Sequence, residues 1–341
     1  MMTPDRRTEM SDAPTVLITD FIHDALEPER AVLAGLANVR ALDAKCEEEL
    51  AGRIEDALFL IVYHTISVRR PTIERLRRCR LIVRGGVGYD NIDCDSARER
   101  GIPVANVPAY GTEDVADTAI GLMLALTRGF AQLNSRMRDG ADAWTHTYAA
   151  PLHRLAGRVY GVIGAGRIGT AAALRAKALR MDVCIYDPYK PDGYEKALGV
   201  RRVESLEDLL AQSFAVSLHC PLTSETRHMI DAAAIACMPR GSYLVNTARG
   251  AVVDTSAIPA AIESGHLAGA AIDVLEKEPP PADDDLLRAW RDANHPAYHR
   301  VLITPHAAFY TEEGATEMRA TAADTCRRMI LGLPVRSIVN A

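Results

Sequence analysis

The most informative feature of this 341-residue chain is the glycine-rich segment GVIGAGRIG at residues 161–169, almost halfway along it. An apolar run at 159–163 precedes the glycines, and an alanine- and leucine-rich stretch follows at 167–179. A second apolar run at 182–186 then ends in Asp187. A glycine turn between a strand and a helix lets a pyrophosphate approach the backbone at the helix N-terminus. The pattern alone also fits a glycine loop without a ligand, but this order of elements favours dinucleotide binding.

Asp187 narrows the choice of dinucleotide. It lies 18 residues beyond Gly169 (187 − 169), where an acidic side chain can accept hydrogen bonds from a ribose 2′-hydroxyl. A carboxylate there would repel the 2′-phosphate of NADP, whereas Arg201 and Arg202 lie too far along the chain to bind that phosphate. We therefore expect NAD.

The midway position of the turn leaves about 150 residues for a different domain. Apolar runs in that part alternate with helical stretches, which predicts an α/β domain with a mostly parallel sheet. These runs lie at residues 16–19, 58–63, 81–83 and 103–105. A strongly helical stretch at 113–128 follows, with Thr112 as its expected N-cap.

Composition excludes several classes of protein. The chain is 48% hydrophobic and 25% charged, which is ordinary for a globular enzyme, and its net charge of −6 argues against a nucleic-acid binder. We find no secretion signal and no apolar run of membrane-spanning length. The seven cysteines lack CxxC spacing, which favours a reducing cytoplasm. Because Pro296 separates His295 from His299, we expect no metal site.

Polar side chains follow each later apolar run. In an open parallel sheet, ligands lie outside the carboxyl ends of the strands, so these side chains should meet in one crevice. Arg249, Glu278 and His306 are the most interesting of them. The runs lie at residues 214–218, 242–245, 268–274 and 301–303.

These three residue types suit the reduction of a 2-oxo acid. That reaction needs a cation to hold the carboxylate and polarise the carbonyl, and an acid to deliver a proton. Arg249 and His306 supply those groups, and Glu278 beside His306 would favour the imidazolium. Taken singly, each also has an ordinary structural interpretation as a loop cap, a solvated charge or a core histidine.

The order of GAGRIG, NTARG, EKEPP and TPHAA resembles the D-isomer-specific 2-hydroxyacid dehydrogenases over nearly the whole chain. Within that family the chain looks most like the C-terminal-binding-protein branch, and D-3-phosphoglycerate dehydrogenases are more distant. The supporting strings are YHT at 63–65, VRGGVGYDNID at 83–93, VPAYG at 107–111, YDPY at 186–189 and HAAFY at 306–310.

The resemblance implies roles for individual residues. Arg249 would bind the substrate carboxylate and carbonyl, His306 would be the general acid/base, and Glu278 would orient and charge His306. The implied substrate contacts are His64, Arg84, Val87, Gly88, Arg249 and Phe309. The implied NAD contacts are Thr118, Gly164, Gly166, Arg167, Ile168, Gly169, Asp187, His219, Cys220, Pro221, Thr247, Ala248, Arg249, Asp273 and His306.

The resemblance also implies an architecture. We expect two Rossmann-like or flavodoxin-like doubly wound α/β domains, with the nucleotide domain inserted into a discontinuous substrate domain. The expected bounds are a loose tail at 1–13, a substrate domain at 14–115 plus 309–341, and an NAD-binding domain at 116–308. A C-terminal helix at 311–331 would pack back onto the substrate domain. A homodimer is expected through residues 113–128 and the aromatic stretch near Trp144.

Two interpretations of the function remain open at this point. The leading one is an NAD-dependent oxidoreductase for a small D-2-hydroxy acid and its 2-oxo acid, and the alternative is an NADH-sensing interaction protein of the co-repressor type. The chain departs from its relatives at Phe309, where eukaryotic co-repressors carry tryptophan, and in a long connection at 283–300. That insert is expected to be a lid, an oligomer contact or a surface loop.

Overall fold

The computed structural model describes residues 13–140 and 144–341, so the predicted tail at 1–13 lies almost wholly outside the described residues. The chain divides into two compact units. Unit 1 contains the chain up to Gly111 together with Thr311–Ala341, and unit 2 contains Thr112–Tyr310. Unit 1 is therefore assembled from two separate stretches of sequence.

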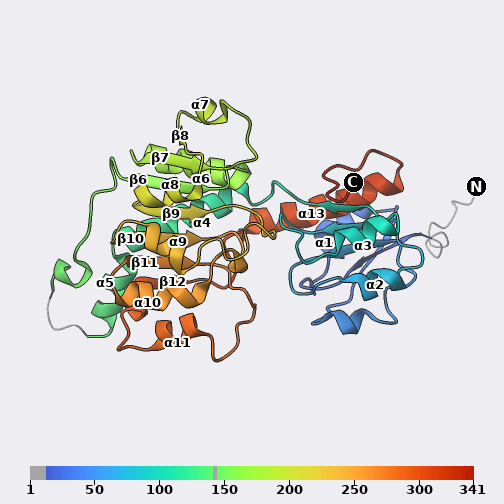
Figure 1. Ribbon diagram of the computed structural model, residues 1–341. Coiled ribbons are helices and arrows are strands. Elements are labelled where there is room, and N and C mark those ends of the chain that lie inside the picture. The colour runs from blue at the N-terminus through green and yellow to red at the C-terminus, as the bar shows by residue number, and fades with distance from the viewer. Residues whose placement is uncertain (1–12, 141–143) are drawn as a thin grey trace, which may run out of the picture. The chain divides into compact units, whose positions relative to one another are not determined.

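Unit 1 is built on a five-stranded parallel sheet in the order β2-β1-β3-β4-β5. Figure 1 labels the α-helices of this unit. Its central strands are short runs of fully buried apolar residues, as expected for strands that are covered on both faces. The strands are β1 (Thr15–Ile18), β2 (Asn38–Ala41), β3 (Phe59–Val62), β4 (Leu81–Arg84) and β5 (Val104–Asn106). The helices are α1 (Glu27–Leu33), the 3-10 helix η1 (Glu47–Leu50), α2 (Arg70–Arg75), α3 (Cys94–Glu99) and α13 (Glu312–Ile330).

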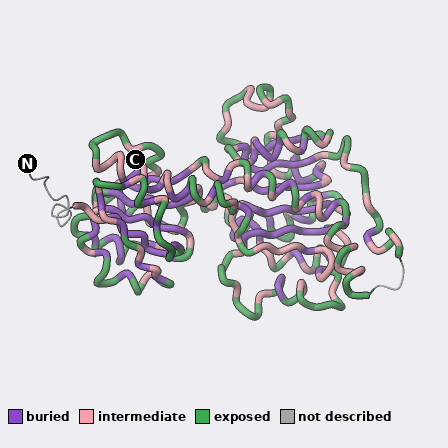
Figure 2. Tube along the Cα trace, turned by 180° about the vertical axis from the view of Figure 1, so that it is seen from behind, coloured by how far each residue is buried: buried purple, intermediate pink, exposed green. Residues whose placement is uncertain are grey.

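Unit 2 is built on a seven-stranded parallel sheet in the order β12-β11-β10-β9-β6-β7-β8. Figure 2 shows that its strands form the buried interior of the unit. The strands are β6 (Val159–Ile163), β7 (Asp182–Tyr186), β8 (Arg201–Arg202), β9 (Ala215–Leu218), β10 (Ser242–Asn246), β11 (Leu267–Ile272) and β12 (Val301–Ile303). The 3-10 helices of this unit are η2 (His146–Ala149), η3 (Gly250–Val252) and η4 (Thr255–Ala257).

Two helices of unit 2, α4 and α6, pack against each other, and α6 begins directly after the glycine turn. Ala116 of α4 packs with Ala171 and Ala172 of α6, and these small side chains let the two helices approach closely. The α-helices are α4 (Thr112–Thr127), α5 (Phe130–Arg138), α6 (Arg167–Ala178), α7 (Tyr194–Leu198), α8 (Leu206–Gln212), α9 (Ala232–Cys237), α10 (Ile258–Glu263), α11 (Asp285–Arg291) and α12 (Ala297–Arg300).

The predicted fold class of two doubly wound parallel-sheet units is confirmed. Two strands were missed, β2 and β8, because both are edge strands with polar residues and so lack a buried apolar run. Helix α4 begins at Thr112, the residue predicted as its N-cap, and therefore one residue before the predicted helix start at 113. The insert at 283–300 contains α11 and α12. Within the described ranges, no helix has the length and apolar character needed to cross a bilayer.

The C-terminal stretch is tied into unit 1 by charge and by hydrogen bonds. Arg319 of α13 is buried, and its Nε donates to Glu29 of α1 at 2.7 Å while its Nη1 donates to Asp24 at 2.6 Å. Near the chain end, the Asn340 side chain accepts a hydrogen bond from the Val104 amide at 2.7 Å and so continues the edge of β5. The helix expected at 311–331 is thus held to unit 1 by the fully buried carboxylate of Glu29.

We predict that Glu29→Gln destabilises unit 1 by about 3 kcal/mol, because removing one partner leaves the buried Arg319 charge poorly compensated. The matched control is Asp324→Asn, which breaks a partly exposed pair with Arg327 on the same helix and should cost no more than about 0.5 kcal/mol. Urea unfolding followed by far-ultraviolet circular dichroism measures both. Equal midpoints for the two variants would contradict the prediction.

Candidate functional site

The glycine turn after β6 is shaped by close backbone contacts. Gly164 has φ +88°, and a Cβ on it would lie 2.7 Å from the Cys220 amide nitrogen. A Cβ on Gly169 would lie 1.9 Å from the Gly164 carbonyl oxygen. At Gly166, by contrast, a Cβ would meet no atom within 4 Å. Two glycines are therefore required by packing, and the third leaves the helix N-terminus open to an approaching ligand.

Asp187 is fixed above this turn. One of its carboxylate oxygens accepts a hydrogen bond from the Ala165 amide at 2.8 Å, and the other accepts one from the Tyr189 amide at 3.0 Å. An ionised carboxylate has about four lone-pair sites, so capacity remains for two hydroxyl donors. The acid thus lies where the sequence pattern requires it.

The segment after β9 faces the same turn, because β9 and β6 are neighbours and the strand order reverses between them. Burial lowers the pKa of His219 to about 4 and raises the pKa of the Cys220 thiol to about 11. Both side chains are therefore uncharged at neutral pH. Directly after β10, Thr247 is buried, and its hydroxyl has no hydrogen-bond partner among the described residues.

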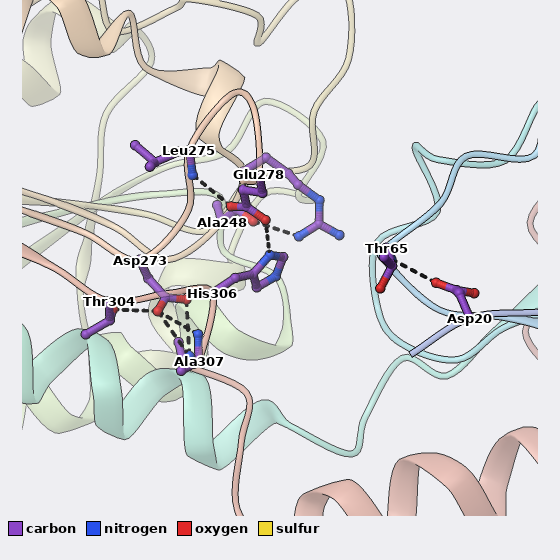
Figure 3. Close-up of polar contacts among 11 residues, drawn as sticks. Asp20, Thr65, Ala248, Asp273, Leu275, Glu278, Thr304, His306 and Ala307 are labelled. Atoms are coloured by element: carbon purple, nitrogen blue, oxygen red, sulfur yellow. Dashed lines mark hydrogen bonds and ion pairs between the residues drawn. The ribbon is translucent and has the colours of Figure 1, made fainter. Parts of the chain in front are cut away.

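Glu278 and His306 come together after β11 and β12 (Figure 3). Arg249 follows β10, the strand next to β11 in the sheet. His306 Nδ1 lies 2.7 Å from Glu278 Oε2, and the other Glu278 oxygen accepts a hydrogen bond from the Leu275 amide at 2.8 Å. Arg249 Nη1 donates to the Ala248 carbonyl at 2.7 Å. The Glu278 carboxylate thus bridges Nδ1 of the His306 ring and the backbone of its own loop.

Gly250 allows this approach. A Cβ at Gly250 would lie 1.9 Å from the carbonyl carbon of Leu275, so the loop that carries Glu278 packs directly on the Gly250 backbone. The Asn246 side chain donates to the Arg249 carbonyl at 2.9 Å and closes the turn that presents Arg249. The NTARG sequence therefore has a structural reason for its glycine and its asparagine.

A buried carboxylate fixes the turn that carries His306. Asp273 Oδ1 accepts hydrogen bonds from the Thr304 hydroxyl at 2.5 Å and the Ala307 amide at 2.9 Å, and Oδ2 accepts one from the Ala308 amide at 3.1 Å. His306 itself has φ +51°, and its amide donates to the Asp273 carbonyl at 2.8 Å. The left-handed backbone of His306 is thus imposed by the turn around it.

Asp20 fixes a loop of unit 1 in the same way that Asp273 fixes the turn around His306. Its buried carboxylate accepts hydrogen bonds from the amides of Tyr63 at 2.9 Å and Thr65 at 2.8 Å (Figure 3). The Asn91 side chain donates to the carbonyls of Tyr63 and Ile66 at 2.7 and 2.8 Å. The loop that carries His64 is therefore held from both sides.

Gly85 and Gly86, directly after β4, let two side chains pack closely against the backbone. A Cβ at Gly85 would lie 2.6 Å from the Tyr63 ring, and one at Gly86 would lie 1.5 Å from Arg84 Nη1. Arg84 is buried and donates to the Gly85 carbonyl at 3.1 Å. The next residue, Val87, is fixed through its carbonyl, which accepts a hydrogen bond from the Asn106 side chain at 2.7 Å.

Residues 120–308 match the model of the "D-isomer specific 2-hydroxyacid dehydrogenase, NAD binding domain". The chain belongs to this family.

Individual relatives cover this chain well. It is 35% identical to D-3-phosphoglycerate dehydrogenase of Methanocaldococcus jannaschii over 95% of this chain and 59% of the relative. It is 33% identical to C-terminal-binding protein 1 of Caenorhabditis elegans over 89% of this chain and 42% of the relative. The chain thus spans about half the length of these curated relatives.

Among solved structures, the crystal structure of Aquifex aeolicus D-lactate dehydrogenase with NAD and lactic acid matches with a TM-score of 0.83 and 30% identity. This match covers 93% of this chain and 96% of that one. A glyoxylate reductase from Paecilomyes thermophila has a TM-score of 0.81 and 30% identity over 96% of this chain and 98% of that one. Both likenesses extend through unit 1 as well as unit 2.

The family's cofactor is NAD, and the residues of unit 2 fit it. The cradle at Gly166 suits a pyrophosphate, Asp187 retains acceptor capacity for ribose hydroxyls, and the partnerless Thr247 hydroxyl suits a polar group of the cofactor. Asp273 and Thr118 have an additional observed role, because both bind the 304–308 turn, Thr118 through the Ala308 carbonyl at 3.3 Å. Their assignment as NAD contacts stays a prediction.

Asp20 and Asn91 are the functional-site residues that the sequence reasoning missed. Asp20 directly follows the apolar run at 16–19, so its place at the carboxyl end of a strand was a usable signal. Asn91 lies inside the GGVGYDNID string, but its bonds to a loop about 25 residues earlier left no mark in the local pattern.

We predict that Gly250→Ala displaces the 275–278 loop and separates Glu278 from His306. The control is Gly121→Ala in helix α4, where an added Cβ meets nothing within 4 Å and should slightly stabilise the helix. The hydrogen-bonded Nδ1 proton of His306 gives a downfield proton NMR signal, assigned by its loss in His306→Gln. That signal should disappear in Gly250→Ala and persist in Gly121→Ala; its survival in both would sink the idea.

Proposed function

We propose that this protein is an NAD-dependent oxidoreductase that interconverts a small D-2-hydroxy acid and its 2-oxo acid. The observation that carries the proposal is the His306–Glu278 pair at 2.7 Å at the carboxyl ends of the strands of an NAD-binding domain, in which Arg249 follows the neighbouring strand β10. A bare nucleotide-binding domain has no need for a general acid with its own carboxylate. We assign residues 116–308 to NAD binding and 14–115 plus 309–341 to substrate binding.

The chemistry follows from these side chains. When bound, NADH would supply the hydride to C2 of the 2-oxo acid, and NAD+ would accept it from C2 of the hydroxy acid. In the reducing direction, Arg249 holds the carboxylate and draws electron density towards the carbonyl oxygen, and His306 Nε2 donates the proton that this oxygen takes up. Glu278 keeps the ring oriented and compensates the imidazolium charge. In the oxidising direction His306 takes the proton back.

The remaining substrate contacts are proposed from unit 1 and from the end of unit 2. Backbone amides of Val87 and Gly88 would bind the carboxylate, and His64 and Arg84 would line the site. Phe309 meets the His306 ring edge-on, with centroids 6.1 Å apart, and would limit the space beside the general acid.

The second candidate is an NADH-sensing interaction protein of the co-repressor type. The 33% identity to C-terminal-binding protein 1 of Caenorhabditis elegans favours it. A pure sensor requires only the nucleotide site, whereas this chain also has the His306–Glu278 pair and, after the neighbouring strand β10, Arg249. We therefore favour the enzyme.

We predict that Arg249→Ala and His306→Gln each lower kcat/KM for 2-oxo-acid reduction by about 100-fold or more, because each removes a transition-state interaction. NADH binding, measured by fluorescence titration, should change little in His306→Gln. Turnover is followed by NADH oxidation with glyoxylate, hydroxypyruvate, phenylpyruvate and 4-methylthio-2-oxobutyrate. Wild-type turnover in either variant would contradict the mechanism, and NADH-dependent partner capture without turnover in the native protein would favour the sensor.

We further propose a cytoplasmic homodimer formed through unit 2. The cysteines of the described chain are all free thiols, which suits a reducing compartment. Trp144 and Phe130 are exposed by 95% and 60%, an unusual exposure for two large aromatic side chains in one region. Phe130 lies just beyond the end of the predicted contact helix α4, and Trp144 lies in the aromatic stretch that is also predicted as a contact.

We predict that the double variant Phe130→Glu, Trp144→Glu is monomeric, because dimerisation would bury two uncompensated carboxylates on each protomer. The control is Tyr189→Glu, which changes another aromatic side chain of unit 2 that is 76% exposed. Sedimentation equilibrium gives the masses. A monomeric native protein, or a double variant of unchanged mass, would refute the proposed interface.

A further inference from the structure

The topology of unit 1 marks a ligand position of its own. In the order β2-β1-β3-β4-β5, the chain leaves β1 in one direction to form β2 and continues in the other direction from β3. Ligands of open parallel sheets bind at the carboxyl ends of the strands where the order reverses, which here are β1 and β3. The loops at that point are residues 19–22 and 63–66.

Phe21 lies in the first of these loops and has an unfavourable backbone conformation. Its φ is +67°, a left-handed conformation that costs a bulky L-residue free energy, and its side chain is 37% exposed. A large aromatic residue that is strained and also exposed contributes little to the core. Strain of this kind persists only where the surroundings impose it, and it concentrates at ligand sites.

The surroundings of Phe21 impose its position. The neighbouring Asp20 carboxylate holds the amides of Tyr63 and Thr65, and the Ile22 amide donates to the Asp20 carbonyl at 2.7 Å. The Phe21 ring then packs on the His64 ring, with centroids 4.5 Å apart and an interplanar angle of 56°. Its centroid lies 5.7 Å from that of the Tyr63 ring.

We propose that Phe21 is a specificity-determining residue, and that Phe21 and His64 form the wall of a subsite for the side chain of the substrate. The subsite takes a bulky apolar group, either aromatic or branched aliphatic. The chemistry of the wall gives this class. The exposed Phe21 face offers dispersion and stacking contacts and no hydrogen-bond donor, so it favours a hydrocarbon side chain over hydrogen or a hydroxyl group. This inference rests on the proposed reduction of 2-oxo acids.

The Tyr63 ring also lies close to the Phe21 ring. Burial raises the pKa of the Tyr63 phenol well above its usual range. That ring is buried, and its hydroxyl stays protonated at physiological pH. The wall therefore presents no acidic side chain of its own to a substrate, and its selectivity depends on shape and apolar contact.

The test compares phenylpyruvate with glyoxylate as substrates of the full-length protein with NADH. In Phe21→Ala, the ratio of kcat/KM for phenylpyruvate to that for glyoxylate should fall about tenfold or more, mainly through KM for phenylpyruvate. Phe21→Tyr, which keeps the ring, should stay within about threefold of the native ratio. Leu333→Ala, which shortens a similarly exposed apolar side chain of unit 1, should leave the ratio unchanged.

The outcomes separate the two proposals. An unchanged ratio in Phe21→Ala, or an equal loss for both substrates, would overturn the role of Phe21 while the oxidoreductase proposal stands. If the native protein reduces no 2-oxo acid, the proposed function fails. Calorimetric titration of phenylpyruvate into the NADH complex then decides the subsite: weaker binding to Phe21→Ala than to Leu333→Ala supports it, and equal binding overturns it.

Discussion

The functional loops of both units depend on one kind of interaction, a buried carboxylate that accepts backbone N–H groups. Asp20 binds amides of residues 63, 65 and 66, and Asp273 binds amides of residues 307 and 308 together with the Thr304 hydroxyl. Burying a lone carboxylate is costly, but several charge-assisted hydrogen bonds offset that cost. Each acid thereby converts a flexible connection after a strand into a fixed platform.

Parallel pairing determines where those platforms lie. Every strand pair in the two sheets of the described chain is parallel, so the strands of each sheet end along one edge. In unit 2 the order reverses between β6 and β9, which gives the glycine turn its partner segment at 219–221. In unit 1 it reverses between β1 and β3, which brings Phe21 beside His64. The same topological rule thus locates the nucleotide turn and the proposed substrate wall.

The sequence predicts what a local pattern can encode. The apolar runs at 159–163 and 182–186 coincide with β6 and β7, because buried parallel strands are continuous apolar segments. The meeting of Glu278 with His306 followed from polar residues placed after neighbouring strands. The partners of Asp20 could not be predicted, since they are main-chain amides about 45 residues away and amides carry no sequence signal. The edge strand β8 lacked a pattern for a related reason: Arg201 and Arg202 pack against one neighbour only.

Anchoring through the main chain separates the conformation of a loop from the identity of its side chains. The bonds from Asp273 reach amides of Ala307 and Ala308, so they would persist if those side chains changed. The bonds from Asp20 to residues 63–66 have the same property. A position such as Phe21 or Phe309 can then differ among relatives while the backbone around it stays fixed. In this architecture the acids and close-packed glycines maintain the backbone geometry of the loops, and the side chains that these loops carry can vary without disturbing it.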